Sequence, residues 1–236
     1  MASVNTTTLS AVENIPRKHW IVSFGQLCRK QPLGAAGGLI VLVMLLATVF
    51  ANVLSPYDPE AASFEHMLMP PSADFWFGTD AFGRDILTRI IYGARTALFV
   101  GFTAALVGAT AGLVLGVASA YYGGLFDLIF QRVVDVVMAF PLIVLALAIV
   151  ATLGASTVNV IIAITIPFIP QCARVVRSSA LAIREIPYVD AARALGFGHA
   201  RIILRHMVPN VMAPYLIMLT TFVGHAILLE ASLSYL

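Results

Sequence analysis

The sequence contains little charge. Asp, Glu, Lys and Arg make up 11% of its 236 residues, whereas hydrophobic residues make up 60%, and the mean hydropathy is +0.92. A soluble globular domain carries about 25% charged residues. The shortage of charge therefore excludes an ordinary water-soluble domain, and we expect no nucleic-acid partner.

Cysteine is equally scarce. The two cysteines, Cys28 and Cys172, stand alone, and neither belongs to a C-x-x-C pair or a Cys/His cluster. Zinc sites and disulfide frameworks need such groupings. We therefore expect no metal site and no disulfide framework, and both side chains are interpreted as filling space.

Nucleotide-binding and catalytic motifs are also missing. There is no G-x-x-x-x-G-K-[ST] loop to hold nucleotide phosphates, and "GFGHAR" at 196–201 lacks the final glycine and the preceding strand of a dinucleotide-binding turn. No H-E-x-x-H, no G-x-S-x-G and no pair of carboxylates deep in an apolar run occurs either. We expect a chain that is not an enzyme, binds no cofactor itself and cannot hydrolyse ATP.

Long apolar runs dominate what is present. A bilayer core about 30 Å thick requires roughly 20 apolar residues of helix. Five stretches qualify: Leu33–Leu54, Thr96–Ala120, Val133–Leu153, Val158–Cys172 with a few flanking residues, and Val211–Leu229. They predict an all-α fold, a polytopic transmembrane helical bundle.

The first and fourth spans and the end of the chain have special features. The first span is longer than the apolar region of a signal peptide, about 7–15 residues, so it is interpreted as an uncleaved anchor. Pro167 and Pro170 predict a bend near one end of the fourth span. Because five spans are odd in number and the chain ends on "EASLSYL" without a polar tail, we expect a sixth span to be missing at the C-terminus.

The distribution of basic residues predicts the orientation, because short cytoplasmic loops are rich in Lys and Arg. Residues 1–31 carry four basic residues against one acidic residue, whereas residues 55–83 carry five acidic residues and no Lys or Arg. This pattern places the N-terminus in the cytoplasm. Residues 174–209, called here the polar segment, then also lie in the cytoplasm. The segment contains six of the fourteen Lys and Arg residues: Arg174, Arg177, Arg184, Arg193, Arg201 and Arg205.

Three arginines depart from this rule. Arg84, Arg89 and Arg95 fall on the outer side of the predicted topology. The stretch "GRDILTRIIYGARTAL" that holds them has apolar residues on one helical face. We expect it to form an amphipathic helix at the outer surface, before the second span begins.

The second span carries small residues at every fourth position. Residues four apart share a helix face, and small side chains allow another helix to approach closely. The pattern predicts close helix packing against a partner in this chain or in another subunit. The members of this small-residue stripe are Ala104, Gly108, Gly112, Gly116 and Ala120.

The polar segment is predicted to form two short helices. "PYVDAARAL" begins with Pro187, has Asp190 in its first turn and is followed by Gly196, which suits a helix stop. A second helix, roughly His199–His206, follows, and Pro209 precedes the fifth span. Ala191 and Ala192 make the surface of the first helix small and smooth, as a docking surface requires.

The polar segment resembles the EAA loop of bacterial binding-protein-dependent ABC importer permeases, whose form is E-A-A-x3-G-x9-I-x-L-P. The small pair Ala191-Ala192, Gly196 and Pro209 match at the same spacing, whereas Asp190, His206 and Val208 replace Glu, Ile and Leu. "RHMVPN", "GTDAFGRDILTRIIYGART" at 78–96 and "EASLSYL" at 230–236 are similar to the dipeptide, oligopeptide and nickel branch. The resemblance covers nearly everything after residue 20.

The resemblance implies a type I ABC importer permease fold and a division of labour among subunits. It implies a heterodimer with a sister permease, two cytoplasmic ATP-binding subunits that hold ATP and Mg2+, and an extracytoplasmic substrate-binding protein. The location implied is the bacterial inner membrane, and the solute is a peptide or a related small molecule. The residues implied to couple this chain to the ATPase are Asp190, Ala191, Ala192, Arg193, Gly196, His206 and Pro209.

These observations divide the chain into four parts. Residues 1–31 form a cytoplasmic leader, 32–55 the first anchor, 56–95 an extracytoplasmic loop with the amphipathic helix, and 96–236 the permease core with its loop at about 174–209.

Polar residues within spans are candidate functional sites, because burying them in lipid is costly. Asn159, Gln171, His225 and Glu230 are candidates for the lining of the translocation pathway. His225 and Glu230 are alternatively interpreted as facing water near the outer surface. Arg132 and Asp135 are interpreted as an i, i+3 ion pair at the membrane edge.

Two alternatives stay open at this stage. The polar segment is alternatively a basic connector that enforces topology and contacts anionic lipid. The whole chain is alternatively a secondary transporter or a channel subunit without an ATPase partner, although the inverted repeats and midplane carboxylates of many secondary transporters are not evident.

Overall fold

The computed structural model describes residues 29–55 and 57–235. The predictions for most of the leader and for Cys28 lie outside these residues. Contacts divide the chain into two compact units, residues 1–54 and 55–236. The described part of the first unit holds α2 (Pro32–Val49) and α3 (Ala51–Leu54). Pro32 starts α2, where its missing N–H is tolerated. The predicted first span is therefore helical, with an interruption at Phe50.

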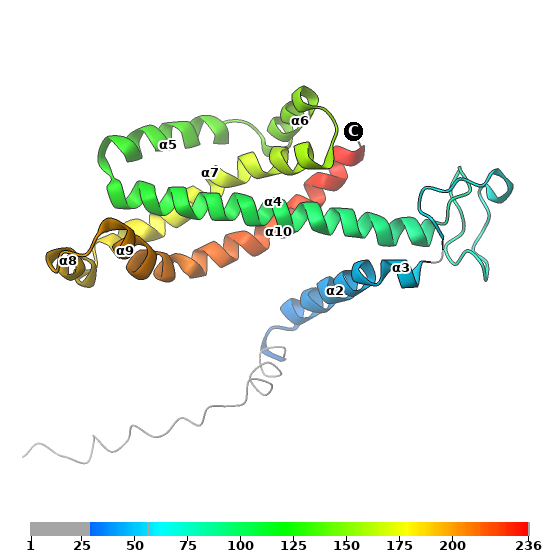
Figure 1. The fold of residues 1–236 in the computed structure, drawn as a ribbon, viewed down its shortest axis with the longest axis horizontal. Coiled ribbons are helices and arrows are strands. Elements are labelled where there is room, and N and C mark those ends of the chain that lie inside the picture. The colour runs from blue at the N-terminus through cyan, green and yellow to red at the C-terminus, as the bar shows by residue number, and fades with distance from the viewer. Residues whose placement is uncertain (1–28, 56, 236) are drawn as a thin grey trace, which may run out of the picture. The chain divides into compact units, whose positions relative to one another are not determined.

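The second unit is built around three long helices, α4 (Ile86–Tyr122), α7 (Thr157–Arg184) and α10 (Met212–Tyr235). Figure 1 shows α4 running along both α7 and α10. The rings of Phe168 on α7 and Phe222 on α10 stack at 4.1 Å in the core. The described residues include four helices long and apolar enough to span a membrane, or five if the bent pair α5–α6 counts as one span. The predicted all-α membrane bundle is thus confirmed.

The prediction of a separate amphipathic helix before the second span was wrong. α4 is one continuous helix of 37 residues from Ile86 to Tyr122. Its N-terminus is fixed by Asp85, whose carboxylate accepts hydrogen bonds from the N–H of Thr88 at 2.8 Å and from its hydroxyl at 2.6 Å. No proline lies between residues 86 and 122, so nothing in the chain forces a break before the apolar run begins.

The third predicted span, Val133–Leu153, was also wrong as a single helix. The structure has α5 (Gly124–Met138) and α6 (Leu142–Leu153), which meet at a bend of 87°. Pro141 precedes α6, and a proline disfavours helical backbone at the residue before it. Pro141 therefore explains the break, which the apolar character of the run did not indicate.

α7 exceeds the fourth predicted span. It continues through both Pro167 and Pro170 as an α-helix and ends only at Arg184. The start of the polar segment is consequently part of α7 and not a loop. The bend expected from the prolines stays a prediction.

Candidate functional site

The polar segment folds into the two short helical pieces that were predicted. α8 (Pro187–Ala194) is confirmed, with Asp190 in its first turn and Arg193 in its last. These two side chains pair across the helix at 3.1 Å. α9 (His199–Ile202) follows, then a π-helical turn labelled η3 (Ile203–Met207) and a 3-10 turn labelled η4 (Val208–Val211) that leads into α10. The second helix is therefore shorter than predicted and changes its winding.

Gly196 closes α8 in a left-handed conformation with φ +77°. The N–H of Phe197 donates to the carbonyl of Ala192 at 3.1 Å, and the N–H of Gly196 donates to that of Arg193 at 2.9 Å. This pair of bonds is a Schellman motif, which satisfies the last carbonyls of the helix. Apart from its chain neighbours, no described residue has an atom within 4 Å of a Cβ at Gly196. Glycine is favoured here because of the left-handed backbone conformation, and not because neighbouring atoms exclude a side chain.

The two alanines of α8 face different ways. Ala192 is 4% exposed and packs with Val189 into the protein's own core, whereas Ala191 is exposed together with Asp190 and Arg193. Residues three apart share a helix face, so Val189 and Ala192 turn inward together. The surface open to a partner is thus formed by Asp190, Ala191 and Arg193. The prediction that Ala192 contributes to that surface was wrong.

His206 and Pro209 shape the corner between α9 and α10. The carbonyl of His206 accepts hydrogen bonds from the Tyr188 hydroxyl at 3.1 Å and from the Asn210 amide at 2.6 Å. Pro209 has no backbone N–H, so the hydrogen-bond pattern of the helix is interrupted there. The side chains of Tyr188 and Asn210 supply donors instead. Tyr188 and Asn210 were not singled out from the sequence, because each is an ordinary polar residue of a polar stretch.

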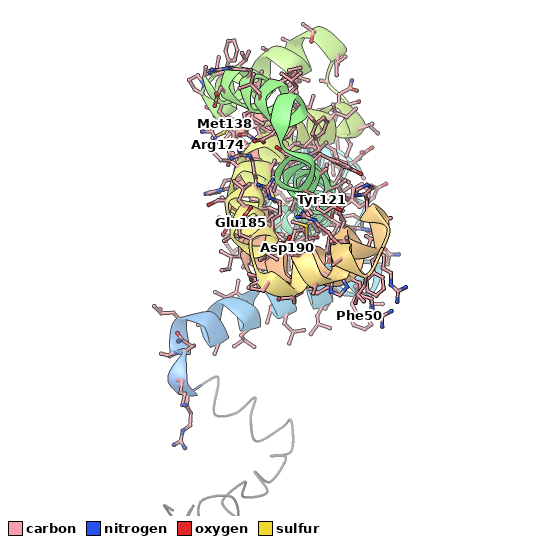
Figure 2. The ribbon with its side chains drawn as sticks, turned by 90° about the vertical axis from the view of Figure 1, so that its left-hand side faces the viewer. Phe50, Tyr121, Met138, Arg174, Glu185 and Asp190 are labelled. Atoms are coloured by element: carbon pink, nitrogen blue, oxygen red, sulfur yellow. The ribbon has the colours of Figure 1, made fainter. Side chains whose placement is uncertain are left out.

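The far end of α4 is also held by the polar segment. The Tyr121 hydroxyl lies 2.7 Å from Nδ1 of His199, and the guanidinium of Arg193 lies 5.4 Å from the centre of the Tyr121 ring. Arg184 donates from Nη1 to the carbonyl of Ala120 at 2.9 Å. Figure 2 shows Tyr121 next to α8, which carries Asp190. Sequence reasoning missed Tyr121, and the only signal was the polar aromatic pair at the end of an apolar run.

The small-residue stripe of α4 packs against α7 of the same chain. A Cβ on Gly112 would lie 2.5 Å from Cβ of Cys172 and 2.9 Å from the carbonyl oxygen of Ile169. A Cβ on Gly116 would lie 2.6 Å from the carbonyl oxygen of Ala173. The absence of side chains thus brings the two backbones together. All five positions are buried: Ala104, Gly108, Gly112, Gly116 and Ala120.

Ion pairs join α5 to α7, and the sequence revealed little of them. Arg177 binds Asp127 in a bidentate geometry, with Nε at 2.6 Å and Nη2 at 2.5 Å from the two carboxylate oxygens. Ser119 of α4 donates a short hydrogen bond to the same carboxylate. Both charged side chains are half-buried, and a paired charge costs far less to bury than a lone one.

A second pair lies along the same two helices. Asp135 lies 2.5 Å from Arg174 and 3.9 Å from Arg132. The predicted i, i+3 pair with Arg132 therefore exists at the limit of contact, but the closer partner comes from α7. A periodic pattern can reveal neighbours on one helix only, so it could not have found Arg174.

Residues 57–85, predicted to lie on the outer side and called here the outer segment, supply one carboxylate that binds two arginines. Asp80 binds Nε of Arg84 at 2.8 Å and Nη1 of Arg89 at 2.5 Å. Partial burial opposes ionisation of Asp80. The hydrogen bonds from the N–H groups of Arg84 and Phe82 and from the two guanidinium groups outweigh it, and the pKa of Asp80 falls from 3.8 to about 2. The carboxylate of Asp80 therefore offsets part of the positive charge of the arginines that depart from the orientation rule.

The four polar residues proposed for the pathway differ in their surroundings. Asn159 uses its amide to hold the α6–α7 turn, donating to the carbonyls of Leu153 at 2.8 Å and Gly154 at 2.9 Å. Gln171 on α7 and Glu230 on α10 are half-buried.

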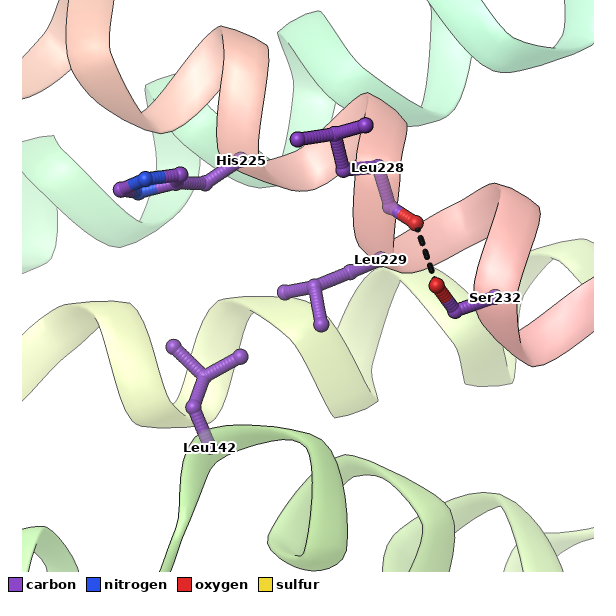
Figure 3. A pocket seen from close by; sticks show the side chains of 5 residues that line it. All are labelled: Leu142, His225, Leu228, Leu229 and Ser232. Carbon is purple, nitrogen blue, oxygen red and sulfur yellow. Dashed lines mark hydrogen bonds between the residues drawn. The ribbon is translucent and has the colours of Figure 1, made fainter.

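His225 is exposed and borders an open pocket of about 240 Å3. Figure 3 shows the pocket between the start of α6 and the second half of α10, with Leu142, Leu228, Leu229 and Ser232. Ser232 uses its hydroxyl for the Leu228 carbonyl at 2.8 Å. Within residues 29–55 and 57–235, no three His, Cys, Asp or Glu side chains are close enough to hold a metal ion.

Two parts of the chain match the models of known protein families. Residues 108–236 match the model of the binding-protein-dependent transport system inner membrane component, and residues 26–71 match that of the N-terminal transmembrane domain of oligopeptide transport permease C. A Brucella suis protein, named provisionally as a peptide transport system permease, is 42% identical over 236 residues, which are 100% of this chain and 79% of the relative.

Two further relatives have specific names. The dipeptide transport system permease protein DppC of Alkalihalophilus pseudofirmus is 42% identical over 92% of this chain and 71% of its own length. The glutathione transport system permease protein GsiD of Escherichia coli O6:K15:H31 is 37% identical over 90% of this chain and 71% of its own length.

Proposed function

Because the chain belongs to the family of binding-protein-dependent transport system inner membrane components, which are permease subunits of ABC importers, we propose that it carries peptides and is driven through its polar segment. Such subunits span the membrane and are not enzymes themselves. Energy must therefore come from a separate ATPase that holds ATP and Mg2+.

The observation that carries the coupling role is the outward face of α8. Asp190, Ala191 and Arg193 are exposed on a helix whose inner face is anchored by Val189 and Ala192 and whose end is fixed by Gly196. A rigid, small and polar face suits a cleft of a partner protein. His206 and Pro209 hold the following corner, so a push on α8 reaches α10. These contacts favour a coupling element over a basic connector.

The substrate proposal follows from the relatives. Their names include peptide, dipeptide and glutathione transport, and this chain shares 37–42% identity with them. We propose di- or oligopeptides, or a closely related small solute. A sister permease would complete the pathway, and an extracytoplasmic binding protein would deliver the peptide.

The proposed orientation has the N-terminus and the polar segment in the cytoplasm of a bacterium, with residues 57–85 outside the inner membrane. The pairing of Asp80 with Arg84 and Arg89 supports this orientation, because it reduces the positive charge that would otherwise lie on the outer side.

Co-purification tests the function as a whole. The tagged chain is expressed with the products of its neighbouring genes, solubilised in mild detergent and isolated. We expect an ATP-binding subunit to co-purify, and the reconstituted complex to hydrolyse ATP faster when a peptide-loaded binding protein is added. A chain that transports peptides in vesicles without any ATPase would instead establish a secondary transporter or a channel.

A further inference from the structure

Three long helices of the second unit meet the polar segment in different ways. α7 leads directly into α8 along the chain, and η4 leads directly into α10. α4 ends at Tyr122, 65 residues before Pro187, so it has no covalent connection to α8 nearby. Movement of the polar segment therefore reaches α4 through non-covalent contacts.

Tyr121 makes the most specific of these contacts. Its side chain is only 7% exposed, although it lies at the end of its helix. Its hydroxyl lies 2.7 Å from Nδ1 of His199, at the first residue of α9, and the two rings meet edge to face with centroids 5.6 Å apart. His199 itself is exposed. The imidazole thus connects the surface of the polar segment to a buried tyrosine of α4.

A second residue, Arg193 of α8, lies against the same ring. The guanidinium of Arg193 lies over Tyr121 with its carbon 5.4 Å from the ring centre, a distance at which a cation and an aromatic face attract each other. Arg193 also binds Asp190 on the outward face of α8. One aromatic side chain therefore contacts both short helices of the polar segment.

We propose that Tyr121 and His199 are positioning residues that transmit movement of α8 and α9 to α4. The proposal rests on the proposed coupling function and adds a route within the permease. When the ATPase shifts α8, the hydrogen bond and the ring contacts draw the inner end of α4 along. The other route runs from α7 to α4 through the small-residue stripe and through the hydrogen bond from Arg184 to the Ala120 carbonyl, and it would move α4 only together with α7.

Removal of a single hydroxyl separates the two routes. Tyr121→Phe keeps the ring and the cation–π contact but deletes the hydrogen bond. The matched control is Tyr122→Phe, since Tyr122 is exposed and its hydroxyl makes no hydrogen bond to a described residue. Both variants are assayed in the complete complex, reconstituted in vesicles, for ATP hydrolysis and for peptide uptake in parallel.

We expect Tyr121→Phe to assemble normally and to raise the number of ATP molecules hydrolysed per peptide transported by about threefold to tenfold, the effect of losing one hydrogen bond on an equilibrium. Tyr122→Phe should leave that ratio unchanged. His199→Leu should behave like Tyr121→Phe. His199→Asn should keep the ratio of the parent, because the asparagine amide reaches about the position of Nδ1.

Two outcomes overturn the proposal. The first is an unchanged ratio in Tyr121→Phe and His199→Leu, which would assign transmission to the contacts between α7 and α4. The second is an equal loss of ATP hydrolysis and uptake caused by poor assembly, which would assign the contact a structural role only. Neither outcome affects the proposed function, which fails only if α8 itself proves irrelevant to ATP-driven uptake.

Discussion

At the scale of single residues, the chain depends on a few positions where chemistry permits little substitution. Gly196 is one, because α8 ends there with a left-handed backbone. Asp80 is another, because it is the common partner of two arginines. The first position was evident from the sequence as a helix stop. The second was not, because its partners are recognised only when the outer segment is folded.

Gly196→Val should uncouple transport while leaving the membrane helices intact. A β-branched residue at φ +77° is strained by about 1–2 kcal/mol or more, so the Schellman turn should open and α8 should lose its fixed end. We expect normal amounts of protein in the membrane, with a sharp loss of peptide uptake and of ATPase stimulation by the loaded binding protein.

Gly196→Asn is the matched control, because asparagine tolerates the left-handed conformation. It should retain most of the uptake. Equal and full coupling in the valine and asparagine variants would show that the turn does not position α8.

Asp80→Asn should loosen the outer segment in a pH-dependent way. The folded pKa of Asp80, about 2, lies below its ordinary value of 3.8. The ionised carboxylate therefore contributes stability above about pH 4, and that contribution is lost as the pH falls through 2. We expect a loss of about 1 kcal/mol at pH 7, because the pair is partly exposed and screened.

Fluorescence of Trp76 measures this effect in a Trp20→Phe background, since the chain has only these two tryptophans. The parent and the variant should differ in thermal unfolding of the segment at pH 7 and converge near pH 2. Asp74→Asn is the control, because Asp74 is exposed and its carboxylate has no partner among the described residues. A difference that persists unchanged at pH 2 would contradict the ionic origin.

At the scale of helices, two kinds of contact hold the second unit together. The small-residue stripe of α4 brings its backbone against α7, and the pairs Asp127–Arg177 and Asp135–Arg174 tie α5 to α7. Lipid offers no hydrophobic force to drive helices together, so close packing and polar contacts must supply the association. α7 is therefore the helix that joins α4 to α5.

Gly112→Leu should disrupt the α4–α7 contact. Even a Cβ at this position would meet Cys172 and the backbone of residues 169 and 173 at 2.5–3.0 Å. Overpacking of this kind typically costs about 1–3 kcal/mol. We expect less assembled protein in the membrane and a lower melting temperature in detergent.

Gly93→Leu on the same helix is the matched control, because, apart from the nearby backbone of α4, no atom of the described residues lies within 4 Å of a Cβ at residue 93. It should assemble like the parent. Normal stability and transport of Gly112→Leu would mean that the two helices are not in contact in the membrane.

At the scale of the whole molecule, the second unit carries the outer segment before α4 and the polar segment, which begins within α7 and ends just before α10. α4 runs from one to the other, beginning at Asp85 and ending beside His199. Its 37 residues extend about 55 Å at 1.5 Å per residue, which exceeds a bilayer core of about 30 Å. We therefore expect both segments to lie beyond the apolar layer.

Cysteine labelling tests the proposed orientation of the molecule. Ala62→Cys and Ala200→Cys, each exposed, are introduced separately after Cys28 and Cys172 are replaced by alanine. An impermeant thiol reagent should label position 62 in intact cells and position 200 only after the membrane is opened. Labelling of position 200 in intact cells would reverse the orientation and exclude coupling to a cytoplasmic ATPase through α8.

The sequence by itself determined the helical membrane architecture, the polar segment with its glycine stop and the small-residue stripe. Each is a local or periodic pattern, because a helix is built from residues close along the chain and hydropathy decides which parts enter lipid. The break at Pro141 was also local, but a long apolar run concealed it.

Tertiary structure alone decided which faces and partners these elements use. It buried Ala192 and left Ala191 exposed, and it paired Asp127 with Arg177 and Tyr121 with His199. These partners stand 50 and 78 residues apart along the chain. No periodicity spans such distances, so the contacts arise only when packing of the long helices brings the side chains together.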